Sequence, residues 1–198
     1  MKRLKKSLLL ISLGAAAIWV LSQFLRLPFL PVHPHEAVPR HTAVVVLLTP
    51  EKLQKLKSEE GKNSMAELAL PTALVADWDA YAKHFAPVFT QKKQTETLAL
   101  LQPTRTRGVD VMFVFDEMRD NDLDAILGKN RDWRMRKSLF KGHDVFTVKI
   151  AGEEFAFARY RNLLLFARHA YLVENALSQL GRPADSLCRD SGFSGMAK

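Results

Sequence analysis

Residues 8–25 read LLLISLGAAAIWVLSQFL, an uncharged run that begins at Leu8 and ends at Leu25. At a rise of about 1.5 Å per residue this run would cover about 27 Å as a helix, close to the roughly 30 Å of a bilayer's hydrocarbon core. Cations precede it at Lys2, Arg3, Lys5 and Lys6, and one follows at Arg26. The sequence therefore predicts an N-terminal transmembrane helix with its N-terminus in the cytoplasm.

Two other interpretations of this run remain open. A cleaved signal peptide has the same basic start and apolar centre, but its small residues should follow the run, and Ala15, Ala16 and Ala17 lie inside it. A buried core helix would not require the basic flank. Both the anchor and the signal peptide export the rest of the chain. We expect a single-pass protein of the inner membrane, in contact with the lipid bilayer through residues 8–25 and with its bulk in the periplasm.

The charge of the chain follows mainly from this topology. The 198 residues carry 29 Lys and Arg against 21 Asp and Glu, a net charge of +8. Five of the cations lie in residues 1–26, which contain no acidic residue, so the remainder carries 24 against 21, or +3. A nucleic-acid binder would concentrate positive charge on its folded domain, so this distribution argues against nucleic acid as a partner. The single cysteine, Cys188, cannot form an internal disulfide.

Three parts follow one another along the chain: a basic flank and anchor at residues 1–27, a Pro-rich stalk at 28–41 and a domain at 42–198. The stalk is expected to be stiff because proline fixes φ and favours extended neighbours. In the domain, hydrophobic periodicity and turn residues predict strands and helices. Strands are expected at 42–49, 95–102, 109–116, 133–141, 145–150, 153–160 and 163–168. Helices are expected at 51–58, 66–85, 120–127 and 170–180.

This order of elements predicts the fold class. Hairpins cluster in residues 133–168, and helices separate the groups of strands. We expect an α+β fold, with the N-terminal transmembrane helix followed by a mostly antiparallel sheet whose helices pack on one face. The face of the helix at 66–85 that meets the sheet should carry Leu74, Trp78, Tyr81 and Phe85, which recur at helical spacing.

Residues 39–56, PRHTAVVVLLTPEKLQKL, and residues 176–193 carry a resemblance. The first stretch combines a proline, a buried strand and a Leu-rich helix after a short anchor. The second combines a helix ending in leucine with a loop of the form Ser-Leu, acid, Phe. Together they resemble bacterial membrane-anchored exported proteins of a domain-of-unknown-function family, DUF3352. The resemblance implies an extracytoplasmic α+β domain without a known activity, and a second half beyond Lys198.

The sequence predicts no catalytic residue, no cofactor and no metal site. Metal ligands need fixed geometry, which His33, His35, Glu36 and His41 would lack on a solvated stalk. The acidic residues near 120 do not match an EF-hand, because Ala125 and Arg131 stand where glycine and glutamate are needed. Cys188 lacks a recognisable nucleophile motif.

A basic stretch at residues 131–141 offers the one candidate contact surface. Its cations alternate with apolar side chains, an arrangement that binds anionic surfaces but is also typical of a strand with one buried face and one solvated face. The half-buried strand is the favoured interpretation. The candidate residues for an anionic-surface contact are Arg131, Arg134, Arg136 and Lys137.

Three hypotheses for function follow. The first is a membrane-tethered extracytoplasmic module, not an enzyme, that binds a protein or polymer of the cell envelope. The second is an envelope hydrolase whose catalytic residues are dispersed or lie in a missing half. The third is an intracellular nucleic-acid binder, which would require residues 8–25 to be a core helix.

Overall fold

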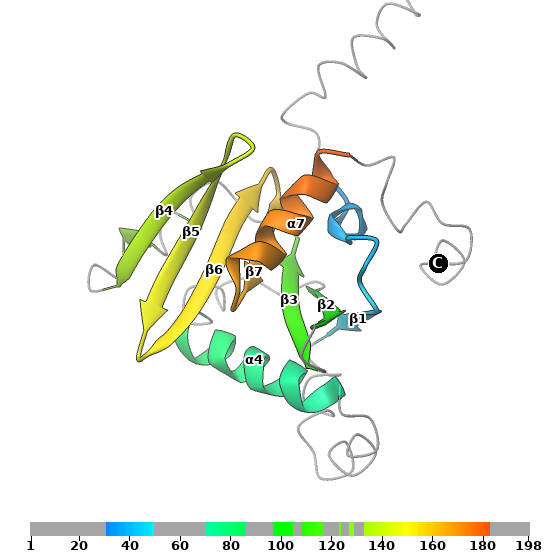
Figure 1. The fold of residues 1–198 in the computed structure, drawn as a ribbon, viewed down its shortest axis with the longest axis horizontal. Coiled ribbons are helices and arrows are strands. Elements are labelled where there is room, and N and C mark those ends of the chain that lie inside the picture. The colour runs from blue at the N-terminus through cyan, green and yellow to red at the C-terminus, as the bar shows by residue number, and fades with distance from the viewer. Residues whose placement is uncertain are drawn as a thin grey trace, which may run out of the picture. The chain divides into compact units, whose positions relative to one another are not determined.

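The computed structural model describes residues 31–49, 70–85, 97–104, 108–116, 123, 127–128 and 133–182. Within them the chain forms one antiparallel sheet, two α-helices and a short 3-10 helix (Figure 1). The helices are η1 (Pro34–Ala37), α4 (Leu70–His84) and α7 (Ala170–Leu180). The strands are β1 (Val44–Leu48), β2 (Thr97–Pro103), β3 (Val109–Phe115), β4 (Arg134–Phe140), β5 (His143–Ile150), β6 (Glu153–Tyr160) and β7 (Leu163–Ala167).

The seven strands lie in the order β1-β2-β3-β7-β6-β5-β4, and every neighbouring pair is antiparallel. The last four strands form a continuous meander that begins at one edge of the sheet with β4. The meander returns to the centre, where β7 pairs with β3. The edges of the sheet are therefore β1 and β4, and Figure 1 shows β4 at the left.

Two-residue turns set the register of the meander. Lys141 and Gly142 join β4 to β5 with φ of 50° and 83°, and Ala151 and Gly152 join β5 to β6 with φ of 52° and 90°. Positive φ at both central residues is the type I′ turn, whose twist matches that of the paired strands. Glycine adopts this conformation without steric cost, so it occupies the second position of both turns.

One face of the sheet is covered by α4. The buried side of this helix carries Leu74, Trp78, Tyr81 and, just beyond its end, Phe85, as the helical spacing predicted. Aromatic rings from the sheet meet it: the Tyr81 ring lies 4.7 Å from that of Phe115, centroid to centroid. Such aromatic pairs add about 0.5–1.5 kcal/mol to the free energy gained by burial.

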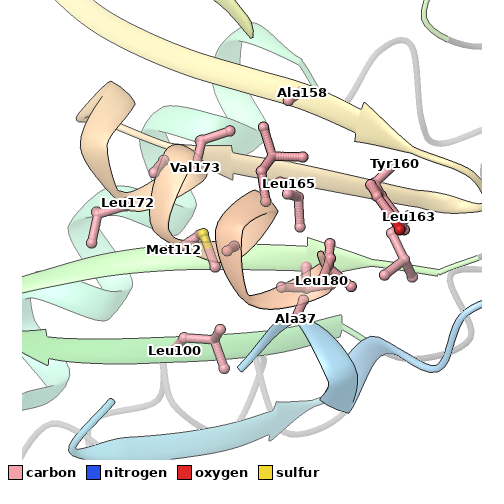
Figure 2. Packing of buried hydrophobic residues seen from close by; sticks show 14 of the residues in the cluster. Ala37, Leu100, Met112, Ala158, Tyr160, Leu163, Leu165, Leu172, Val173 and Leu180 are labelled. Carbon is pink, nitrogen blue, oxygen red and sulfur yellow. The ribbon is translucent and has the colours of Figure 1, made fainter. Parts of the chain in front are cut away.

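The opposite face is covered by α7 together with η1. Leu172, Val173 and Leu180 of α7 are buried over strand residues that include Met112 and Leu165 (Figure 2). The side chains beneath α7 are small at Ala156, Ala158 and Ala167, and this lets the helix approach the sheet closely.

The fold class predicted from the sequence is wrong in two respects. The helices pack on both faces of the sheet, because β2 and β3 are apolar on both sides and each side needs cover. Among the residues that the structure describes, no helix is long and apolar enough to cross a membrane. Helices α4 and α7 have 15 and 11 residues, whereas a span needs about 20. Residues 8–25, which carried the transmembrane prediction, lie outside the described residues.

Residues 32–41 of the predicted stalk pack on the domain. Val32, Ala37 and Val38 are buried in the core beneath α7. The side chain of Asn162 ties this segment down, since it accepts a hydrogen bond from the backbone N–H of Val32 and donates one to its carbonyl. From Val32 onward, this segment is therefore part of the domain core.

Candidate binding surface on edge strand β4

Strand β4 is exposed along almost its whole length. Each residue from Arg134 to Ser138 is exposed, Leu139 is 73% exposed, and only Phe140 is partly buried against the core. Because alternate residues of a strand point to opposite faces, this means that β4 is solvated on both faces. The half-buried strand expected from the alternating sequence is therefore not what forms here.

The predicted contact residues divide between the two faces of β4. Lys137 pairs with Phe146 and Met135 with Val148, whose side chains lie in the core on the α4 side of the sheet. Arg134 and Arg136 pair with Lys149 and Thr147, and so point to the α7 side. Arg131 lies outside the described residues. The structure thus places two arginines on one face and one lysine on the other.

The three cations differ in their surroundings. The Nζ of Lys137 lies 2.7 Å from a carboxylate oxygen of Asp144, and both side chains are about half exposed, at 57% and 45%. An exposed ion pair of this kind contributes about 0–1 kcal/mol, so it leaves Lys137 available to a stronger partner. Among the described residues, neither Arg134 nor Arg136 has an acidic side chain in its cross-strand position. The α7 side of β4 is therefore a patch of positive charge.

Exposed apolar side chains accompany these cations. Met135 and Leu139 are 42% and 73% exposed and share the α4-side face with Lys137. The aromatic residue that precedes the strand is not part of this surface, because the ring of Trp133 packs on Phe85 at 4.9 Å. Strand β4 therefore exposes arginine and methionine side chains together. Both residue types are enriched in protein interfaces relative to the rest of the surface.

A second polar cluster lies at the end of the sheet where β7 meets α7. Arg168 donates hydrogen bonds to Asp77 of α4 and to Glu153 of β6, the latter over 3.2 Å. Burial raises the pKa of Asp77 even though Arg168 acts to lower it. Burial also opposes the charge on Arg168, but Asp77 and Glu153 outweigh it and raise the pKa of the guanidinium. The carboxyl bears the greater desolvation cost because its side chain is 15% exposed, against 30% for Arg168.

The same cluster continues onto the other face of the sheet. The hydroxyl of Tyr171, in the first turn of α7, donates a hydrogen bond to Asp110 of β3. Burial and this hydrogen bond raise the pKa of Tyr171 to about 12. His169 Nε2 lies 3.9 Å from the same carboxylate. These contacts hold α4 and α7 at one end of the sheet, and Arg168 neutralises the carboxylates of Asp77 and Glu153. The cluster therefore has a structural role.

The sequence did not indicate this cluster, because its members come from four separate elements and form no local motif. Other sequence candidates are dispersed. His33 and His35 lie side by side, with 3.1 Å between their Nδ1 atoms, whereas His41 contacts Asn175 of α7. No group of three or more His, Cys, Asp or Glu side chains that could hold a metal occurs among the described residues. Cys188 and the acidic residues 117–122 lie outside them.

No family model, no curated protein and no solved structure matches this chain.

Proposed function

We propose that this chain is a binding module of the cell envelope, not an enzyme, and that it recognises an acidic partner through strand β4. The observation that carries the proposal is the exposure of β4 on both faces, with Arg134, Arg136 and Lys137 at its surface. A protein or polymer of the envelope that carries carboxylates or phosphates would neutralise these cations. Charged guanidinium groups bind such anions with two parallel hydrogen bonds, which adds specificity to attraction.

The location in the envelope rests on the sequence. The basic cluster at Lys2–Lys6 before the apolar run of residues 8–25 is the pattern of exported chains. Protease added to intact spheroplasts should digest residues 31–198 from outside. Complete protection of the chain in spheroplasts, with digestion after lysis, would contradict export.

Binding of a soluble polyanion tests the acidic partner. We expect the purified full chain to bind polyglutamate, and the affinity to fall with rising salt because exposed charges are screened. The double variant R134E/R136E should lose most of this binding. A charge-matched double variant, K83E/R182E, reverses two exposed cations on α4 and after α7 and should retain most of the affinity.

Two results would contradict the proposal. One is the absence of polyglutamate binding by the wild-type chain at low salt. The other is equal loss of affinity in the β4 variant and in K83E/R182E, because binding would then reflect net charge and not this strand. Polylysine serves as the control for sign and should not bind. The alternative of an envelope hydrolase with dispersed residues remains a prediction from the sequence.

A further inference from the structure

We propose that β4 binds its partner by strand addition: an extended acidic peptide segment pairs antiparallel with the outer edge of β4 and extends the sheet by one strand. This inference rests on the proposed function and specifies its partner as a polypeptide. Strand addition draws affinity from main-chain hydrogen bonds and specificity from alternate side chains. Both requirements are met by groups of β4.

The outer edge of β4 offers a row of backbone donors and acceptors. A two-residue type I′ turn closes with its flanking residues, here Phe140 and His143, as a hydrogen-bonded pair. Hydrogen-bonded and non-hydrogen-bonded pairs alternate along an antiparallel ladder. The N–H and C=O groups of Leu139, Lys137 and Met135 consequently point away from β5. No described strand pairs with them, and all three residues are exposed.

The side chains of β4 define the sequence that fits. On the α4-side face, Met135 and Leu139 flank Lys137, so the added strand should place an acid between two apolar residues. On the α7-side face, Arg134 and Arg136 favour two acids. For an antiparallel strand these positions give the pattern Thr-Val-Thr-Glu-Glu-Val-Glu, with the first residue opposite Phe140.

Charge selects an acidic peptide over a second copy of this chain. The antiparallel register that pairs two β4 strands over their whole length, Arg134–Phe140, centres on Lys137 and places two Lys137 side chains opposite one another. It would also bring the arginines of both strands together along one edge. Like charges in directly opposed positions destabilise a strand pair, whereas an acidic strand meets an opposite charge at each of them.

The test measures binding of the fluorescently labelled peptide Thr-Val-Thr-Glu-Glu-Val-Glu to the purified full chain. Two peptides methylated on backbone nitrogens make the matched comparison. Methylation of the two valines and the first glutamate removes donors that face β4, and should weaken binding by about tenfold or more. Methylation of the second threonine and the last two glutamates changes three outward groups and should leave the affinity within about threefold. The reversed sequence, with the same composition and charge, should bind more weakly than the designed one.

Charge exchange completes the test. The variant R134E/R136E should no longer bind the designed peptide. It should instead bind a peptide with lysine at the fifth and seventh positions, which lie opposite residues 136 and 134. Circular dichroism confirms that this exposed double variant is folded.

Strand addition would be overturned by equal binding of both methylated peptides, by equal binding of the reversed peptide, or by no binding at all. Should polyglutamate still bind in those cases, the proposed function stands and only this mode of recognition fails. Association of the wild-type chain with itself, blocked by R134E/R136E, would assign the edge to a second copy and also overturn the proposal.

Discussion

Gln102 places an amide in the core, on the same side of the sheet as Met112 and Leu100. Its side chain is 2% exposed, and its Nε2 has no hydrogen-bond partner among the described residues. A buried polar group without a partner costs about 1–3 kcal/mol. Removal of this amide should therefore stabilise the domain.

We predict that Gln102→Met raises the free energy of unfolding by about 1 kcal/mol, because methionine has a similar length and no polar hydrogen to satisfy. The control is Gln179→Met in α7. Gln179 is also buried, but its Nε2 donates to the carbonyl of Arg182 over 3.2 Å, so its loss should destabilise. Urea denaturation of the two variants measures both changes. A shift of the same sign in both would show that the Gln102 amide is satisfied in solution.

The phenol of Tyr171 gives a prediction for alkaline pH. Its pKa in the folded chain is about 12, above the value of about 10 in an unfolded chain. The folded state thus keeps this proton where the unfolded state has lost it. The contribution of Tyr171 to stability is complete below pH of about 10 and is lost as the pH rises toward 12.

Asp110→Asn should lower the pKa of Tyr171, because it removes the negative charge that disfavours the phenolate. The difference in ultraviolet absorbance between each protein and its Tyr171→Phe derivative isolates the titration of this one tyrosine. Asp144→Asn is the control, since Asp144 pairs with Lys137 on another strand. A pKa of Tyr171 that is unchanged by Asp110→Asn would contradict the hydrogen bond.

At the scale of elements, the contact of α7 with the sheet depends on small side chains beneath it. Ala156, Ala158 and Ala167 are at most 1% exposed and belong to the same core as Leu172 and Val173. A larger side chain at these positions must push the helix outward or adopt a strained rotamer.

We predict that Ala158→Leu lowers the free energy of unfolding by about 1–3 kcal/mol, the usual cost of overpacking a core. Ala43→Leu, which adds the same atoms at an exposed residue before β1, should change it by less than about 0.5 kcal/mol. Thermal and urea denaturation measure both variants. If Ala158→Leu were as well tolerated as Ala43→Leu, α7 would not be closely packed on β6.

The elements themselves could largely be predicted from the sequence. The meander from β4 to β7, helix α7 and the buried side of α4 match their expected residues to within a few positions, because alternation, Gly-containing turns and helical spacing are local signals. The side on which each helix packs is not local. Leu98 and Ala99 are neighbours in β2 and both are buried, so both faces of the sheet are covered. The uninterrupted apolar residues in this strand were the sequence signal for that arrangement.

The candidate surface illustrates the same limit. The cations Arg134, Arg136 and Lys137 are evident in the sequence, but their alternation with Met135 and Leu139 favoured a half-buried strand. In the structure β4 lies at an edge of the sheet and both of its faces are exposed, whereas β1 at the other edge is partly buried, so the exposure depends on tertiary packing that no local pattern reports. The cluster around Arg168 was missed because Asp77 and Glu153 are 91 and 15 residues away from it along the chain.

At the scale of the whole molecule, the sheet joins a three-stranded block to a four-stranded meander at β3 and β7. This junction is covered on both sides, by α4 and by α7. The meander extends away from the junction to β4, the least buried strand. Rigid support at the centre and exposure at one edge suit a domain that offers that edge to a partner.

Amide hydrogen exchange of the full chain, with and without bound polyglutamate, shows which part of the sheet the polyanion contacts. If the polyanion binds at β4, protection should increase in β4 and the turn that follows it, with little change in β1 at the opposite edge or in α4. Protection confined to other elements, or spread evenly over the sheet, would contradict β4 as the binding surface.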